Sequence, residues 1–162
     1  MQITARGRYA VMAMADLAGC ACRPEACCRA VRLTEIAERQ GISLAFLEQI
    51  FCRLRQAGLV SAARGPGGGY RLARPAVEIP IIEILRGAGE PIRTTRCSPG
   101  SGPCVKAPLG GRAGGPEREP RGRCQTHDLW AALGQEIERF LASVTLADVI
   151  GKRPAGPEVA AA

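Results

Sequence analysis

Long apolar runs and aromatic residues are both scarce in this sequence. No uninterrupted apolar stretch approaches the roughly 18 residues that a membrane-spanning helix needs, and charged residues interrupt the apolar start of the chain. One Trp, two Tyr and three Phe are the only aromatic residues, so the core must consist mainly of Leu, Ile, Val and Ala. We therefore expect a cytoplasmic protein in which packed helices form most of the fold.

Acidic residues are also fewer than basic residues. The 162 residues carry 22 Lys and Arg against 15 Asp and Glu, for a formal net charge of +7. Residues 1–80 contain eleven Arg and six acidic residues, a net charge of +5, whereas residues 81–162 carry only +2. The length suits one globular unit, or one small domain with an appendage, and argues against a multidomain enzyme. The N-terminal half is therefore the candidate for binding a polyanion such as nucleic acid.

A helix is predicted over residues 4–17, and a cysteine-rich segment follows it. The segment Gly19–Arg32 combines Gly, Pro and four cysteines, which predicts a surface loop. Cysteines in a reducing compartment are metal ligands or free thiols more often than disulfides. The four are Cys20, Cys22, Cys27 and Cys28. Their C-x-C-x4-C-C spacing leaves a second metal site open, but we favour a thiol-containing loop without a dedicated ligand.

Two short helices joined by a glycine turn are predicted next. The first covers Leu33–Gln40 and ends at Gly41, where a left-handed backbone is favoured. The second is capped by Ser43 and has an apolar stripe made of Leu44, Leu47, Ile50, Phe51 and Leu54, with Cys52 as a small packing residue. Its exposed face carries Ala45, Glu48, Gln49, Arg53 and Arg55. This pattern is typical of a helix-turn-helix that enters the DNA major groove, although it equally allows an αα-hairpin with a solvated polar face.

A β-hairpin is predicted directly after the helix pair. Leu59–Arg64 and Tyr70–Arg74 are candidate strands on either side of a GPGGG run, with Arg64 and Arg71 at its shoulders. Pro and Gly fix a tight turn and let the backbone approach a narrow groove, where the negative potential attracts an arginine. The hairpin therefore favours a winged helix over an ordinary flexible tip. No Lys-Ser/Thr pair follows the glycines, which argues against a nucleotide-binding loop.

The single histidine of the chain lies close in sequence to three cysteines. Cys97, Cys104, Cys124 and His127 follow the spacing C-x6-C-x19-C-x2-H. Three thiolates and one imidazole make a complete four-ligand set for structural zinc or for a 2Fe-2S cluster, and the ligand types alone do not separate the two. Unliganded loop thiols are the third interpretation.

Three stretches carry a more specific pattern: ARGRYAVMAMADLA, LTEIAERQGISLAFLEQIFCRLRQAGLVSAARGPGGGYRLAR, and CQTHDLW with the helix after it. On these residues the chain resembles the iron-sulfur cluster regulator (IscR) family of bacterial winged-helix transcription factors, from residue 1 to about residue 150. The resemblance implies a 2Fe-2S cluster on the three cysteines and His127, between the wing and a dimerisation helix. Relatives have only a few residues between successive ligands, whereas nineteen separate Cys104 from Cys124 here. This Gly-, Pro- and Arg-rich stretch is expected to loop out.

A long amphipathic helix is predicted after His127. Its apolar stripe consists of Leu129, Leu133, Ile137, Phe140, Leu141 and Val144. A small domain has little core left to cover this stripe, so we predict pairing with a second subunit to form a homodimer on a roughly palindromic site, with packing onto its own domain as the alternative. The predicted regions are 1–80 (winged helix-turn-helix), 81–127 (connecting helix and cluster loop), 128–150 (dimerisation helix) and 151–162 (disordered tail).

The predicted DNA contacts divide by the part of the duplex that they touch. Phosphate contacts are expected from Arg6, Arg8, Arg53 and Arg55, base contacts from Glu48 and Gln49, and a minor-groove contact from Arg64. The other candidates lie at the start of the second helix and at the hairpin tip: Ser43, Ala45, Phe46, Gly65, Pro66, Gly67 and Gly68. By resemblance, cluster occupancy modulates DNA binding. The iron-sulfur assembly machinery is a further candidate partner, and a membrane is not.

Two other functional classes stay open on the sequence alone. A winged-helix regulator with a structural zinc ion, or without a cluster, would keep the same DNA-binding residues. An iron-sulfur carrier would need neither the ERQGIS helix pair nor the basic hairpin. An enzyme with Cys124 as nucleophile and His127 as base is not expected, because no Asp or Asn orienter can be identified.

Overall fold

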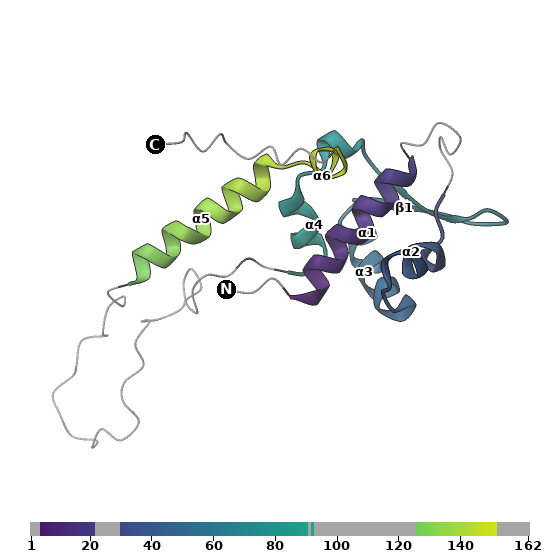
Figure 1. The fold of residues 1–162 in the computed structure, drawn as a ribbon, viewed down its shortest axis with the longest axis horizontal. Helices are drawn as coiled ribbons and strands as arrows, with labels where there is room; N and C mark the ends of the chain where they lie inside the picture. Colours follow the sequence, from purple (N-terminus) through teal and green to yellow (C-terminus); the bar gives the residue numbers. More distant parts are fainter. Residues whose placement is uncertain (1–3, 22–29, 91, 93–125, 152–162) are drawn as a thin grey trace, which may run out of the picture. The chain divides into compact units, whose positions relative to one another are not determined.

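The computed structural model describes residues 4–21, 30–90, 92 and 126–151. Of these, residues 4–90 and 138–151 belong to one compact unit, and residues 92 and 126–137 belong to another. The first unit contains α1 (Ala5–Ala21), α2 (Leu33–Gln40), α3 (Leu44–Gln56), β1 (Val60–Ala63), β2 (Gly69–Leu72), the 3-10 helix η2 (Ala76–Glu78), α4 (Ile81–Gly87) and α6 (Leu146–Ile150) (Figure 1). Helix α5 (His127–Ser143) includes residues of both units. The mainly helical fold class with a small hairpin is confirmed.

Helix α1 lies in the middle of the first unit and contacts α2, α3, α4, α6 and β2 (Figure 1). Its predicted apolar stripe is buried at Ala10, Ala13, Met14 and Leu17. The helix does not stop before Gly19, as the sequence suggested, but continues to Ala21. Ala18, only 1% exposed, extends the buried face by one more position, so continued packing offsets the low helix propensity of Gly19. None of the described helices is both long and apolar enough for a membrane crossing.

The C-terminal end of helix α2 is fixed by backbone geometry and by an ion pair to α1. Gly41 adopts the predicted left-handed conformation, with φ 64°. The Arg39 guanidinium donates hydrogen bonds to the Asp16 carboxylate from Nη2 at 2.8 Å and from Nε at 3.1 Å. This hydrogen bond is the main reason why the pKa of Arg39 is raised above its ordinary value. Arg39 therefore holds α2 against α1.

Helix α3 buries the predicted stripe with one exception. Leu47, Ile50, Phe51 and Leu54 are completely buried, whereas Leu44 is 37% exposed and lies at the edge of the core. Ser43 occupies the N-cap position, but its side chain makes no capping hydrogen bond. Its backbone carbonyl instead accepts hydrogen bonds from the backbone N–H groups of Phe46 and Leu47, so the predicted side-chain cap is wrong.

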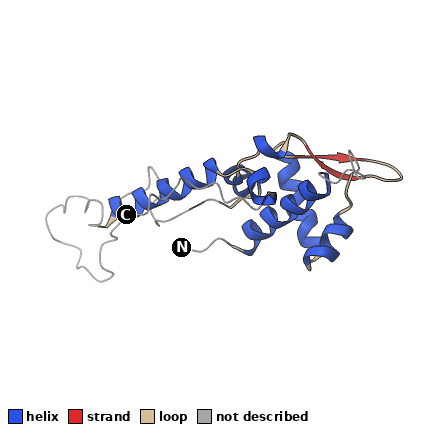
Figure 2. Cartoon of the chain, turned by 45° about the horizontal axis from the view of Figure 1, so that its top comes forward, coloured by secondary structure: helices blue, strands red, loops and turns tan. Residues whose placement is uncertain are grey.

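The hairpin forms as predicted, with slightly shorter strands. β1 and β2 are antiparallel, and Ser61 pairs with Arg71 (Figure 2). At the tip the N–H of Gly68 donates to the carbonyl of Gly65 at 2.8 Å, with Pro66 second and Gly67 third at φ 87°. This arrangement is a type II β-turn, which favours Pro and Gly at those two positions. The turn projects beyond the helices (Figure 2).

A third segment, not predicted from the sequence, pairs with the hairpin. Val31 forms an antiparallel bridge with Tyr70, in which each backbone N–H donates to the other residue's carbonyl, at 2.9 and 2.7 Å. The Tyr70 ring packs edge-on against Phe51 of α3, with ring centroids 4.9 Å apart. The end of the predicted cysteine-rich loop is therefore part of the folded unit, and the hairpin is joined to α3.

Gly69 is required by the close approach of this third segment. A Cβ at Gly69 would lie 2.4 Å from the backbone carbonyl oxygen of Val31, and the residue has φ 154°. We expect Gly69→Ala to lower the free energy of unfolding by about 1–3 kcal/mol, because the backbone of one of the two segments must move. Urea unfolding measures this change. Gly19→Ala is the control, since a Cβ there has open space; an equal loss of stability in both variants would contradict this explanation.

The residues that follow α5 pack into the first unit. Val144 and Leu146 are buried, and they flank Thr145, which forms an antiparallel bridge with Pro80. Thr145 also opens α6 with a capping box: its hydroxyl accepts from the Asp148 N–H at 3.2 Å, and the Asp148 carboxylate accepts from the Thr145 N–H at 2.9 Å. Residues 128–150 therefore form two helices instead of the single helix expected, and the cap is the physical cause of the break.

Candidate nucleic-acid interface and metal ligands

The outer face of α3 is polar and exposed, as predicted. The exposed residues include Ala45, Glu48, Gln49, Arg53 and Arg55. Cys52, predicted to be a packing residue, is exposed on the same face, and its Sγ lies 4.0 Å from Nε2 of Gln56. Position 52 is four residues after Glu48, so helical spacing places it with the polar residues in spite of its neighbour Phe51. The helix can thus present a carboxylate, an amide and a thiol to a groove.

Most arginines of the first unit fall into two groups. Arg39, Arg74 and Arg86 form ion pairs with Asp16, Glu83 and Glu138. A second group has no ion pair with another described residue: Arg6, Arg8, Arg32, Arg53, Arg55, Arg64 and Arg71. Of these, Arg6 is half-buried and the others are exposed. Charges without an internal partner are available to phosphate groups, and this group contains all the arginines that the sequence assigned to DNA contacts.

The N-terminal turns of α1 and α3 lie against each other. The rings of Tyr9 and Phe46 pack edge-on with centroids 5.9 Å apart, and both side chains are half-buried. This contact brings the helix turn that carries Arg6 and Arg8 next to the first turn of α3. Phe46, a predicted DNA contact, therefore also serves the packing of the two helices. Ser43 at the start of α3 is exposed.

The wing tip exposes the residues that were assigned to it. Arg64, Gly65, Pro66 and Gly67 are exposed, and Gly68 is half-buried. Gly68 is enclosed because a Cβ there would lie 2.6 Å from the backbone carbonyl of Ala63. Arg64 stands immediately before the turn, so its side chain is carried by a rigid backbone at the projecting end of the hairpin.

The predicted metal ligands lie mostly outside the described residues. Cys97, Cys104 and Cys124 belong to this part of the chain, as do Cys22, Cys27 and Cys28. His127 is described: it is the first residue of α5 and is partly exposed. No group of three or more His, Cys, Asp or Glu within the described ranges is arranged to hold a metal ion. A set of three thiolates and one imidazole fits an iron-sulfur cluster chemically, as the use of His ligands in Rieske centres illustrates.

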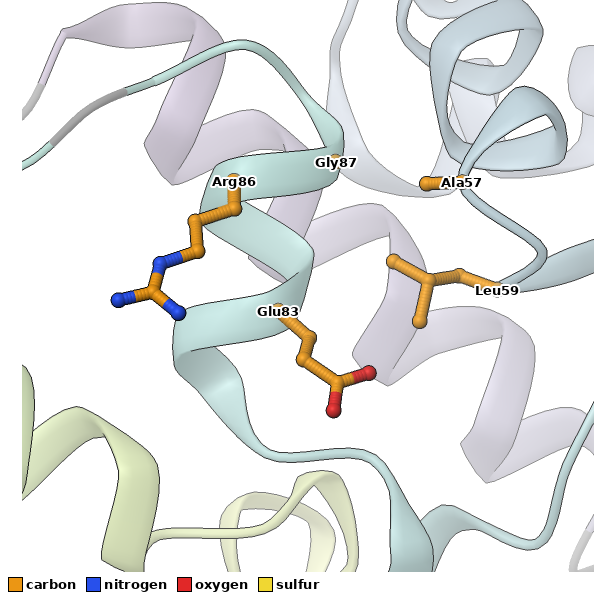
Figure 3. A pocket seen from close by; sticks show the side chains of 5 residues that line it. All are labelled: Ala57, Leu59, Glu83, Arg86 and Gly87. Carbon is orange, nitrogen blue, oxygen red and sulfur yellow. The ribbon is translucent and has the colours of Figure 1, made fainter.

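A shallow pocket of about 320 Å³ lies between the end of α3 and α4. It is lined by Ala57, Leu59, Glu83, Arg86 and Gly87. Figure 3 shows Glu83 and Leu59 directed toward each other, while Arg86 points away from them. Both charged side chains already have partners, because Glu83 pairs with Arg74 and Arg86 pairs with Glu138. The lining contains no Cys, His, Ser or Thr.

Comparisons with known protein families and sequences all match transcriptional regulators. The model of the Rrf2 family, described as an iron-dependent transcriptional regulator, matches residues 3–152. The HTH-type transcriptional regulator IscR of Escherichia coli is 42% identical over 153 residues, which cover 94% of this chain and 82% of that protein. These relatives are named as regulators and not as enzymes, in agreement with the expectation from the sequence.

Solved structures agree with the sequence comparison. T. potens IscR superimposes with a TM-score of 0.65 at 32% identity, covering 94% of this chain and 88% of that one. CymR, the global cysteine regulator of B. subtilis, has a TM-score of 0.66 at 29% identity, with 94% and 98% of the two chains covered. The resemblance noted from the sequence is thus confirmed, as is the winged-helix fold. The chain belongs to the Rrf2 family and is a DNA-binding transcriptional regulator.

Proposed function

We propose that this chain is an iron-sulfur-responsive transcriptional regulator that binds a specific, roughly palindromic DNA site as a homodimer in the cytoplasm. The observation that carries the DNA-binding part of the proposal is the set of arginines on α1, α3 and the wing that have no ion pair with another described residue, beside the exposed polar face of α3. Arg6, Arg8, Arg53 and Arg55 contact phosphates, and Arg64 enters the minor groove beside residues 65–68. Glu48 and Gln49 contact base edges in the major groove, with Ser43, Ala45 and Phe46 beside them.

A 2Fe-2S cluster is the cofactor that we propose for Cys97, Cys104, Cys124 and His127. The family description as an iron-dependent regulator and the identity with IscR proteins support iron over zinc. When bound, such a cluster supplies a centre that responds to redox state and iron supply. An imidazole is released on protonation more readily than a thiolate, so His127 makes the ligand set labile. Cluster occupancy then biases the protein between two states with different DNA affinity.

The homodimer is proposed from the apolar face of α5. Leu129, Trp130, Leu133 and Phe140 are 63%, 44%, 41% and 46% exposed, although all four are large and apolar. An apolar face of this kind on one helix is typical of a protein–protein interface. We propose that α5 of a second copy of this chain covers this apolar face, so that the dimer places two α3 helices on one duplex.

Replacing His127 tests cofactor binding and DNA binding separately. After anaerobic purification we expect the wild type to contain iron and acid-labile sulfide in equal amounts and to absorb visible light, and His127→Ala to lose most of both. The affinity of the variant for DNA should equal that of wild-type protein from which the metal has been removed. Metal analysis, the absorption spectrum and a DNA-binding titration measure these quantities.

Cys52→Ser is the matched control, because it removes an exposed thiol that lies outside the ligand set and should leave the iron content unchanged. Zinc in place of iron and sulfide in the anaerobic wild type would favour a zinc-stabilised regulator. Unchanged iron content in His127→Ala would contradict the assignment of this ligand.

A further inference from the structure

Helix α4 ends in a hydrogen-bonded motif that fixes the next two residues. The N–H of Gly89 donates to the carbonyl of Arg86 at 3.0 Å, and the N–H of Glu90 donates to the carbonyl of Leu85 at 2.9 Å. This is the Schellman arrangement, in which the residue after the C-cap is left-handed; Gly89 has φ 78°. The backbone position of Glu90 is therefore set by the helix end.

Glu90 is the one buried polar or charged residue among the described positions, with 8% of its surface exposed. Its carboxylate accepts a hydrogen bond from the backbone N–H of Thr4 at 3.1 Å and another from the Thr4 hydroxyl at 2.5 Å. Thr4 immediately precedes α1, and its own carbonyl accepts from the N–H of Arg8 at 3.2 Å. A buried carboxylate is costly unless it is hydrogen-bonded, and the N-terminus of a helix is where a negative charge is favoured. Glu90 thus ties the start of α1 to the end of α4.

The C-terminal end of α4 also contacts α3, the helix that carries the proposed base contacts. A Cβ at Gly89 would lie 2.2 Å from Nη1 of Arg53, so the guanidinium of Arg53 lies against the backbone there. The end of α4 therefore contacts the first residues of α1 on one side and α3 on the other. Arg6 and Arg8 lie within the first turn of α1, two and four residues after Thr4.

We propose that Glu90 is a positioning residue for DNA binding: by holding Thr4, its carboxylate fixes the first turn of α1 and so the direction from which Arg6 and Arg8 approach the phosphates. This inference rests on the proposed function, because it assumes that these two arginines contact DNA. Without the two hydrogen bonds the first turn of α1 frays, since the N–H groups that precede the one of Arg8 have no partner inside the helix. The two arginines then lose part of their orientation but keep their charge.

Two substitutions at Glu90 test the proposal. Glu90→Leu has a similar volume, suits a buried site and removes both acceptors. Glu90→Gln can restore both bonds, because its amide oxygen accepts from the Thr4 N–H and its amide nitrogen donates to a reoriented Thr4 hydroxyl. The measured quantity is the affinity of the full chain for a duplex that the wild type has selected from a random pool. We expect Glu90→Leu to bind roughly tenfold more weakly, as for one or two weakened phosphate contacts, and Glu90→Gln to stay within about twofold of the wild type.

The matched control is Glu78→Leu, which removes the same charge from an exposed site and measures the effect of net charge alone. Measuring the effect of Glu90→Leu in a second variant background distinguishes loss of arginine positioning from general destabilisation of the fold. In a chain that already carries Arg6→Ala and Arg8→Ala, adding Glu90→Leu should weaken binding no further, because the side chains that it positions are gone. A loss of global stability would instead lower the affinity by the same factor in both backgrounds, which urea unfolding of each variant would also reveal.

The possible results distinguish an error in the proposed phosphate contacts from an error in the proposed role of Glu90. If Arg6→Ala with Arg8→Ala leaves the affinity unchanged, these phosphate contacts are wrong and the proposed function must be revised. If that pair weakens binding but Glu90→Leu does not, the positioning role is wrong and the DNA contacts stand. Equal losses from Glu90→Leu in both backgrounds would also overturn the positioning role.

Discussion

Replacing Leu129 and Leu133 by glutamate should convert the protein into a monomer. The monomer should bind a palindromic site on the order of a thousandfold more weakly than the wild type, because a second DNA-binding unit is no longer linked to the first. The two side chains are 63% and 41% exposed and lie one helical turn apart on α5. In the proposed dimer each would face the partner helix, and each glutamate would bury a charge there without a counter-charge. Analytical ultracentrifugation measures the subunit mass, and a titration with duplex measures the affinity.

The same charge change on the other side of α5 provides the control. Gln135→Glu with Ala142→Glu also adds two negative charges to the helix, at exposed positions away from the apolar stripe. This double variant should remain a dimer and lose only the part of the affinity that depends on net charge. A dimeric Leu129→Glu, Leu133→Glu variant would show that α5 is not the interface.

Arg64→Ala should weaken DNA binding by about 1–3 kcal/mol, the range expected for one specific arginine contact. The residue stands at the projecting end of the hairpin, next to a type II turn, and has no ion pair with another described residue. An arginine in the minor groove gains from the enhanced negative potential of a narrow groove, so the loss should be larger on A·T-rich sites. The slope of log affinity against log salt should fall by about one. Fluorescence anisotropy at several salt concentrations measures both quantities.

Arg86→Ala removes the same charge from α4, where the guanidinium is paired with Glu138. Since this position is not on the wing, we expect little effect on DNA affinity or on the salt slope. Equal losses from the two variants would mean that the wing contributes only its net charge, and the minor-groove contact would then be wrong.

Elements with a periodic pattern could be predicted from the sequence. The apolar stripe of α3 and the Pro and Gly residues of the wing each determine local geometry, and both elements form where expected. Single positions were less certain. Cys52 was predicted to pack because of its neighbours, whereas its position on the helix places it with the exposed polar residues. Leu44 belongs to the apolar stripe by its spacing, but it lies at the start of α3 and at the edge of the core, where it is 37% exposed.

Contacts between distant segments could not be predicted. The Val31–Tyr70 bridge joins residues 39 positions apart, and the Glu90–Thr4 hydrogen bonds join residues 86 positions apart. Neither pair has a periodic or compositional signal, because each depends on how the helices pack. The break before α6 is different: Thr145 and Asp148 have the spacing of a capping box, so the sequence did contain this signal.

The most direct test of the account measures DNA affinity with and without the cluster in one preparation. Anaerobically purified wild type, the same protein after removal of iron and sulfide, and His127→Ala would be titrated with one selected duplex. We expect the DNA affinity of the intact protein to differ from that of the stripped protein by roughly five- to 150-fold, the usual range of allosteric coupling, and the affinity of His127→Ala to match that of the stripped protein. Identical affinities for all three would contradict the claim that the cysteine and histidine ligands control a DNA-binding unit.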